Sequence, residues 1–306
     1  MTSPISSDGL RTVVKQGVRL GATATSRWRR GPDLVIVGVK RGGTTSLFRD
    51  IERHPAMCPL VPSARRLPLR ENQKGVHFFD TGFHHGERWY RGHFPTETTR
   101  RRRARRVGKA FTAEASPYYF FQPLAARRVA AALPEAQFVV LLRDPVERTV
   151  SHWSEQTRNG VETLTLAEAV DAEESRVGDA GARLADGSIS TSHAHEQKSY
   201  VAQSMYAASI QRWFDAVGRD RLVVAFSEDY YRDPSIVIDE ITDRLGVAAM
   251  TDDEIGRHRN AAPRASAITP DLEASLVERF RPDVAALGEL LGRRPPWPRF
   301  DSPAST

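Results

Sequence analysis

Five short runs of apolar residues lie along the chain between longer segments with helical character. Three of them, 33–39, 137–142 and 222–226, are rich in valine and leucine, as in strands that a sheet buries on both faces. Two weaker runs, 75–79 and 109–114, predict further strands. Strands that alternate with helices favour a three-layer α/β fold around a central parallel sheet.

Six helices are predicted, and five of them are at 46–53, 123–133, 197–217, 234–245 and 270–292. The sixth follows the second clear strand and has strong start signals. Asp144 is a good capping residue, Pro145 suits the first helical position, and Glu147 comes three residues after the cap. The Gly-, Ala-, Ser- and Asp-rich stretch 175–195 instead predicts a mobile loop.

These elements predict a single domain at 33–297, between a basic leader at 1–32 and a loose tail at 298–306. The chain has no run of 18 apolar residues, and its first twenty residues lack the apolar core of a signal peptide. Cys58 is the only cysteine, which excludes an intramolecular disulfide and agrees with a cytoplasmic location. The net charge of +6 favours an anionic partner: a small polyanion, an acidic polysaccharide or nucleic acid.

A glycine-rich loop joins the first strand to the first helix at 38–46, with the sequence GVKRGGTTS. Its glycines permit close approach of the backbone, and the amides at a helix N-terminus bind anions. Thr44 stands where an ATP-binding loop has its lysine, and Arg143 opposes a cation beside Asp144. The loop therefore predicts a site for phosphate without a metal; the alternative is a glycine turn that binds nothing.

A second candidate anchor follows the strand at 137–142. Arg143 ends that strand, at the edge of the sheet where ligands bind, and Ser151 lies two helical turns further along. An arginine and a serine at such an edge bind a second phosphate through charge-assisted hydrogen bonds. The alternative for Arg143 is a salt bridge to the start of the helix.

Together the two anchors resemble those of the sulfotransferases that use 3′-phosphoadenosine 5′-phosphosulfate (PAPS), particularly bacterial relatives of the heparan sulfate sulfotransferases. The resemblance spans Asp33 to Trp297. It also includes weaker motifs at 76–80 (VHFFD), 89–95 (WYRGHFP), 114–119 (EASPYY), 200–213 and 227–229 (SED). It implies a P-loop nucleotide-binding fold, PAPS as co-substrate, 3′,5′-adenosine bisphosphate as product, and no metal.

The resemblance also implies roles for individual residues. Those that cradle the 5′ end of the donor are Arg41, Gly42, Gly43, Thr44, Thr45 and Ser46, to which Lys40 adds charge. Arg143 and Ser151 would hold the 3′-phosphate, and Arg264 matches a late basic position at the same phosphate. Sulfuryl transfer would be in line, with Arg41 and Thr45 stabilising the leaving oxygen.

Three positions depart from the family pattern. Arg41 replaces the usual lysine before the glycine pair, Gly75 replaces a catalytic glutamate, and Ala115 replaces a lysine. The general base is therefore expected first at His77, which titrates near neutrality, and then at Glu114 or Glu71. The alternative for His77 is a structural hydrogen bond to a carbonyl of the sheet.

Other signals have less weight. His77, His84, His85 and His93 lack the spacing of a zinc site. The basic run 100–106 (RRRRARR) suits nucleic acid or an anionic acceptor, but such a run is more often a solvated helix face. The competing functions are a small-molecule kinase and a non-catalytic nucleic-acid binder. The favoured acceptor is a hydroxyl or amine of a carbohydrate or small natural product. No specific nucleic-acid partner is expected. Peripheral contact between the leader and a membrane is left open.

Overall fold

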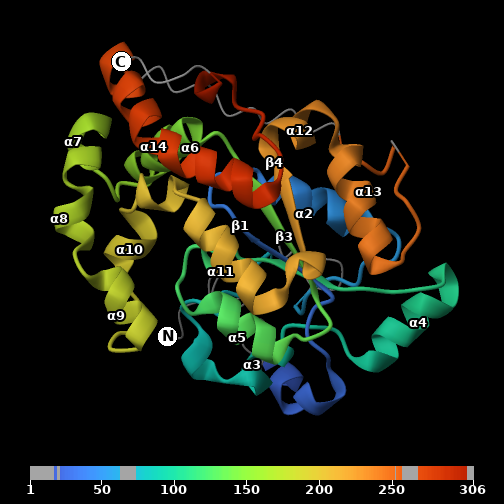
Figure 1. The fold of residues 1–306 in the computed structure, drawn as a ribbon. Coiled ribbons are helices and arrows are strands. Elements are labelled where there is room, and N and C mark those ends of the chain that lie inside the picture. The colour runs from blue at the N-terminus through green and yellow to red at the C-terminus, as the bar shows by residue number, and fades with distance from the viewer. Residues whose placement is uncertain (1–16, 19–20, 63–73, 252, 257–267, 302–306) are drawn as a thin grey trace, which may run out of the picture.

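The computed structural model describes residues 17–18, 21–62, 74–251, 253–256 and 268–301. Four strands form one parallel sheet in the order β2-β1-β3-β4, with helices on both sides (Figure 1). The strands are β1 (Leu34–Gly38), β2 (Ala113–Ala115), β3 (Gln137–Leu142) and β4 (Leu222–Phe226). The predicted α/β fold with a central parallel sheet is confirmed.

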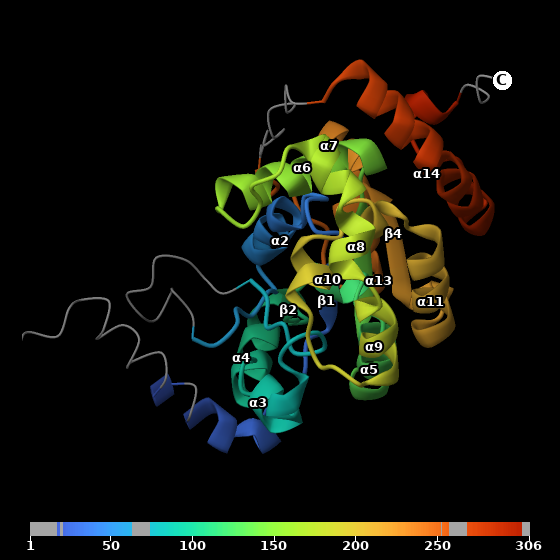
Figure 2. The ribbon, with the colours of Figure 1, turned by 90° about the vertical axis from the view of Figure 1, so that its left-hand side faces the viewer.

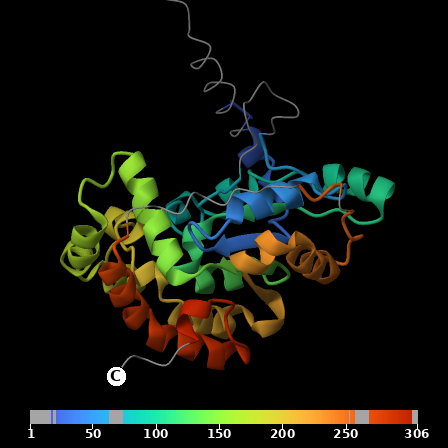
Figure 3. The ribbon, with the colours of Figure 1, turned by 90° about the horizontal axis from the view of Figure 1, so that it is seen from above.

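The two faces of the sheet bury alternate residues of each strand. Leu34 and Ile36 of β1 belong to one apolar cluster, and Val35 and Val37 belong to the other. Helices α2 (Thr44–Arg53), α12 (Ser227–Arg232) and α13 (Pro234–Leu245) cover the first face. Helices α5 (Ala125–Ala132), α11 (Ala207–Val217) and α14 (Pro270–Leu291) cover the second. Figure 3 shows α2, in blue, and α14, in red, on opposite sides of the strands.

Burial on both faces explains why these strands contain almost no polar residue. Each fully buried valine or leucine side chain contributes roughly 1.5–3 kcal/mol relative to an exposed one. The boundaries predicted for β3 and β4 agree with the structure, as do those of α13. Helix α6 (Pro145–Arg158) begins as predicted, because the Asp144 carboxylate accepts hydrogen bonds from the amides of Val146 (2.9 Å) and Glu147 (3.1 Å).

The segment predicted as a loop at 175–195 instead contains helices. Helices α7 (Leu166–Asp171), α8 (Glu173–Val177), α9 (Ala180–Asp186) and α10 (His193–Gln197) stack along one side of the molecule (Figure 2). The prediction was wrong because the small polar residues of this stretch start or end helices. Ser192 caps α10, and Gly178 and Gly187 end α8 and α9 with positive φ angles of 51° and 82°.

Two other predicted elements differ from the structure. Residues 75–79 form no strand, because the amide of Val76 bonds to the Glu114 side chain instead of to a neighbouring strand. The helix predicted at 197–217 begins only at Ala207, after an irregular stretch whose Tyr200 carbonyl is bound by Arg148. The basic run forms α4 (Glu97–Val107), after the short α3 (Glu87–Arg91).

The ends of the chain are described only in part. The leader prediction falls largely on residues 1–16, 19 and 20, outside the described residues. The tail predicted to be loose is held at least as far as Arg299, whose guanidinium pairs with Asp144 (2.8 Å) and Glu147 (3.3 Å) of the α6 N-terminus. These contacts fasten the C-terminal segment beside the end of β3.

Candidate functional site

The glycine-rich loop leaves the carboxyl end of β1 and enters α2 at Thr44. A Cβ at Gly42 would lie 2.3 Å from the carbonyl oxygen of Leu141, and one at Gly43 would lie 2.7 Å from the Tyr231 hydroxyl. Gly43 also has a φ of 90°, in the region that side chains rarely adopt. Both glycines are therefore required for the loop to pack against the end of β3 and α12.

Donors from other elements bind the carbonyl groups of this loop. They are Ser227 Oγ to Gly42 O (2.6 Å), Arg143 Nη1 to Arg41 O (3.3 Å) and Arg148 Nη1 to Lys40 O (3.3 Å). The first amides of α2 have no acceptor within the helix and point out of its N-terminus. The loop therefore combines a fixed backbone with the amide donors and positive dipole end that bind an anion.

The second predicted anchor lies directly against the first. Arg41 donates from Nε to Ser151 Oγ at 3.0 Å and from Nη1 to Glu155 Oε1 at 2.6 Å. Arg143 reaches the loop from the end of β3 and pairs with Glu147 at 3.4 Å. The structure thus brings Arg41, Arg143 and Ser151 together, although Arg41 points toward α6 and not toward the first turn of α2.

The Lys40 side chain extends from the phosphate loop to helix α10. Its ammonium lies 3.2 Å from the carboxylate of Glu196 and 3.0 Å from the side-chain oxygen of Gln197, both in α10. Burial lowers the pKa of Lys40, although the charge of Glu196 opposes this effect. Lys40 therefore ties α10 to the phosphate loop.

His77 forms an acid–base pair with a buried carboxylate. Its Nδ1 lies 2.9 Å from Oδ2 of Asp80, whose side chain is fully buried, whereas 47% of the His77 side chain is exposed. Burial disfavours the charged imidazole, but the hydrogen bond and charge of Asp80 outweigh it and raise the pKa of His77. With Nδ1–H held by Asp80, Nε2 is the nitrogen with a free lone pair.

Glu114 is fully buried beneath His77. Its carboxylate accepts hydrogen bonds from the Val76 amide (2.9 Å), Ser116 Oγ (2.9 Å), Tyr90 OH (2.7 Å) and Tyr119 OH (3.4 Å). Burial raises its pKa, and these donors oppose the rise. The Glu114 carboxylate is therefore enclosed by protein groups that donate hydrogen bonds to it. This environment does not favour the predicted proton transfer between Glu114 and a substrate.

Sequence reasoning missed three residues of this region. Arg148 is fully buried, donates to Ser204 Oγ (2.6 Å) and Tyr200 O (2.6 Å), and has a pKa lowered to about 10 by burial. Asp80 was detectable as the acid three residues after His77. Lys74, whose ammonium lies 2.8 Å from the Thr45 hydroxyl, carried no sequence signal, because only the folding of the chain brings it to α2. Arg264 and Glu71 lie outside the described residues.

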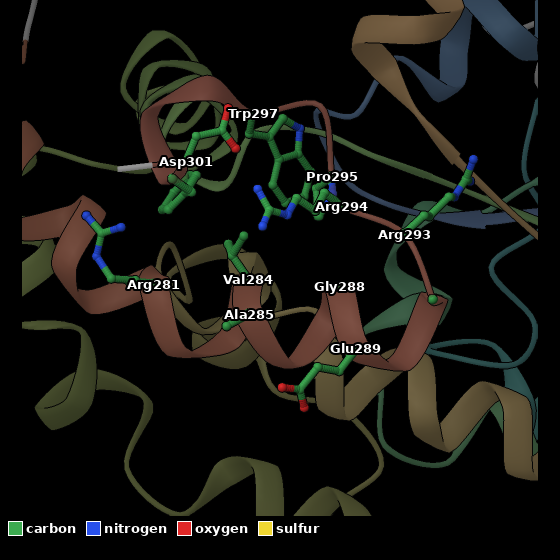
Figure 4. Close-up of a pocket in the computed structure, with 12 residues that line it drawn as sticks. Arg281, Val284, Ala285, Gly288, Glu289, Arg293, Arg294, Pro295, Trp297 and Asp301 are labelled. Carbon is green, nitrogen blue, oxygen red and sulfur yellow. The ribbon is translucent and has the colours of Figure 1, made fainter. Parts of the chain in front are cut away.

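A cavity of about 780 Å³ lies elsewhere, between α14 and residues 293–301 (Figure 4). Arg281, Arg294 and Trp297 are among its lining residues, whereas the phosphate loop, Arg143 and Ser151 are not.

The described residues contain no cluster of three or more His, Cys, Asp or Glu that could hold a metal ion. Within the same residues, no helix has both the length and the apolar character to cross a membrane.

The sheet, the loop and the second anchor define an α/β protein of the phosphate-binding-loop class. Residues 32–252 match the model of the family described as "Sulfotransferase family". This match covers more than half of the 306 residues, and the chain therefore belongs to the sulfotransferase family.

Several proteins resemble the chain. The mouse bifunctional heparan sulfate N-deacetylase/N-sulfotransferase 4 is 25% identical over 221 residues, 71% of this chain and 22% of that protein. The mouse heparan sulfate glucosamine 3-O-sulfotransferase 6 is 26% identical over 226 residues, 74% of this chain and 55% of that protein. The chain thus spans about half or less of these relatives. The crystal structure of a sulfotransferase from Alicyclobacillus acidocaldarius superimposes with a TM-score of 0.61 at 28% identity, over 86% of this chain and 97% of that one.

Proposed function

We propose that the protein transfers a sulfuryl group from PAPS to a hydroxyl or amine of a carbohydrate or small natural product. The observation that carries this proposal is the contact between the two anchors, in which Arg41 bonds to Ser151 and Arg143 bonds to the Arg41 carbonyl. Two anion sites side by side suit a donor with a phosphate at each end of its ribose. Family membership supports the same reaction class.

The residues present fit such a donor. Gly42 and Gly43 leave no room for a Cβ, and the groups around the loop are amides, hydroxyls and cations. Glu155 and Glu147 pair with Arg41 and Arg143, so they hold both guanidiniums in place and compete with phosphate for them. Bidentate arginine contacts with a phosphate dianion are stronger than these single-point pairs. We assign Arg143, Ser151 and Arg41 to the 3′-phosphate, and the first turn of α2 to the 5′-phosphosulfate.

His77 is the proposed general base. Its Nε2 would take the proton of the acceptor as the acceptor oxygen or nitrogen forms its bond to sulfur, while the bond from sulfur to the 5′-phosphate oxygen breaks. Asp80 keeps the imidazole in the required tautomer and stabilises the imidazolium. Glu114 positions the His77 segment in this proposal instead of transferring the proton itself.

The relatives support both kinds of acceptor, because one is named for N-sulfation and the other for 3-O-sulfation of heparan sulfate glucosamine. The lysine at the end of an ATP-binding loop is replaced by Thr44, which speaks against the kinase alternative. The proposed cytoplasmic location and single domain at 33–297 rest on the sequence.

Calorimetric titration with 3′,5′-adenosine bisphosphate, beside ATP and AMP and with or without magnesium, tests the proposal. We expect tight binding of the bisphosphate that needs no magnesium. Preference for ATP with magnesium would support a kinase, and no binding of any of the three nucleotides would contradict a nucleotide-dependent enzyme. With binding established, labelled PAPS identifies the acceptor class in a screen of glycans and small molecules.

A further inference from the structure

Lys74 reaches the first turn of α2 from a distant part of the sequence. Its backbone carbonyl accepts a hydrogen bond from the amide of Ala115, at the end of β2, at 2.9 Å. Its ammonium lies 2.8 Å from the hydroxyl of Thr45 and 3.3 Å from that of Thr44. The segment before Gly75 therefore places a cation where the helix dipole and the first-turn amides already favour an anion.

Three other cations around the loop, Lys40, Arg41 and Arg143, point elsewhere. Arg41 bonds to Ser151 and Glu155, Lys40 bonds to Glu196 and Gln197, and Arg143 bonds to Glu147 and a loop carbonyl. Each of these three has a carboxylate partner. Among the described residues, Lys74 has no carboxylate within ion-pair distance, and its ammonium donates to two neutral hydroxyls.

The surroundings of Lys74 make its charge easy to lose. Burial lowers its pKa to about 8, Arg49 of α2 and Arg41 of the loop lower it further, and Glu155 of α6 opposes them. A dianion bound at the first turn of α2 would reverse this balance, because it adds a nearby negative charge. A bound anion would therefore stabilise the charged ammonium, which has no carboxylate partner among the described residues.

We infer that Lys74 is a catalytic residue for sulfuryl transfer, which stabilises the charge that develops on the 5′-phosphate oxygen. This inference rests on the proposed function. As the acceptor oxygen or nitrogen bonds to sulfur, the bond between sulfur and that phosphate oxygen breaks, and its electron pair stays on the oxygen. The acceptor proton goes to His77, while Lys74 keeps its own proton and donates a hydrogen bond to the leaving oxygen. Thr45 is the neighbouring donor.

Proton uptake on binding of 3′,5′-adenosine bisphosphate tests the inference without any acceptor. Titrations at pH 8.5, in two buffers of different ionisation enthalpy, measure how many protons the complex takes up. A lysine with a pKa of about 8 that becomes fully charged takes up about 0.8 proton at this pH. We expect this uptake in the wild type and not in Lys74→Arg, which is already charged, or in Lys74→Met.

Release of the bisphosphate from PAPS, with water as the acceptor, is the second measurement. We expect Lys74→Met to lower the maximal rate about 10²–10³-fold, as for loss of one donor to a developing oxyanion. We expect kcat/KM for PAPS, which reports the free enzyme, to fall above a pH of about 8 in the wild type and to persist there in Lys74→Arg. Lys109→Met is the matched control, because its ammonium bonds to the Leu245 carbonyl and not to the phosphate loop.

The outcomes separate the two proposals. If the wild type binds no bisphosphate, the proposed function fails and this inference fails with it. If the wild type binds without proton uptake, and Lys74→Met retains its maximal rate within threefold, only the role of Lys74 is overturned. If Lys74→Met folds with an unchanged melting temperature, its lower rate has no structural cause. If it does not fold, the proton uptake and pH profile of Lys74→Arg decide whether Lys74 has the proposed role.

Discussion

Glu114 holds His77 in place through hydrogen bonds to the backbone around it. The carboxylate accepts directly from the Val76 amide, and Ser116 Oγ, which donates to Glu114, accepts from the amide of His77 (3.0 Å). The Tyr119 hydroxyl links Glu114 to the Phe78 amide in the same way. One buried carboxylate thus orders three consecutive amides beneath the imidazole.

Replacement of Glu114 should therefore loosen this segment. We expect Glu114→Gln to lower the free energy of unfolding by about 1–3 kcal/mol, because the NH2 that replaces one carboxylate oxygen cannot accept the two hydrogen bonds made to that oxygen. Hydrogen exchange should accelerate at the amides of residues 76–78. The matched control is Glu87→Gln, which removes an exposed pair with Arg91 and should change stability by less than about 1 kcal/mol. Unchanged exchange at 76–78 in Glu114→Gln would contradict the positioning role.

The His77–Asp80 pair predicts the acid side of the pH profile. The base must be neutral, so the rate of PAPS turnover should rise with pH through the pKa of His77, which Asp80 raises. Asp80→Asn removes this negative charge, lowers the pKa of His77 and should move the acid limb to lower pH. His77→Ala should reduce the maximal rate about 10²–10⁴-fold.

His84→Ala is the control for His77→Ala, since His84 is exposed and, among the described ring contacts, its ring lies only against that of its neighbour His85. Affinity for 3′,5′-adenosine bisphosphate should be unchanged in both variants. A His77→Ala enzyme with a wild-type rate and acid limb would remove His77 as the base.

The backbone of His77 predicts a further difference between variants. Its φ is 55°, in the left-handed region, where a side chain costs about 1 kcal/mol relative to glycine. We therefore expect His77→Gly to be more stable to urea than His77→Ala, although both lack the imidazole and should be equally slow. Equal stability of the two variants would mean that this backbone conformation relaxes when the imidazole is removed.

Replacement of Arg143 measures how much the second anchor contributes to donor binding. We expect Arg143→Ala to weaken binding of the bisphosphate about 10–100-fold, as for loss of a charge-assisted hydrogen bond. Ser151→Ala should have a smaller effect, because its hydroxyl is a neutral donor. Arg102→Ala, at an exposed position of α4, is the control, and calorimetry measures all three. Equal affinities for Arg143→Ala and Arg102→Ala would exclude Arg143 from the donor site.

Glu162 predicts how stability depends on pH. Burial raises its pKa, but the Tyr200 hydroxyl, the Leu164 amide, Lys198 and Arg176 outweigh this effect and lower it to about 2. A carboxylate with a lowered pKa stabilises the fold above its unfolded value of 4.5, and this contribution is lost as the pH falls from 4.5 toward 2. Glu162→Gln should therefore be less stable at pH 7, by about 1–3 kcal/mol.

Urea unfolding between pH 2 and 7 measures this dependence. The decline of stability below pH 4.5 should be shallower in Glu162→Gln than in the wild type. The control Glu240→Gln removes an exposed pair with Arg244 and should leave the decline unchanged. Identical curves for wild type and Glu162→Gln would show that Glu162 does not anchor the α7–α10 layer through its charge.

The sequence alone determined the parallel α/β fold and the neighbourhood of the two anchors. Strands buried on both faces must be continuously apolar, and the carboxyl ends of parallel strands meet at one edge, so β1, β3 and the residues after them were predictable. The start of α6 was predictable as well, because Asp144 and Pro145 act through local hydrogen bonding and a fixed φ angle.

Only the tertiary structure decided which cation meets which partner. Lys74 and Thr45, or Arg41 and Ser151, are brought together by chain folding between residues far apart in sequence, and a long flexible side chain has no preferred direction until its neighbours are in place. The same reason applies to Glu114, whose sequence position suits a catalytic acid or base, but whose burial commits it to the amides beneath His77. Local patterns determine the elements and their order, whereas burial and long-range contacts determine the chemistry of each side chain.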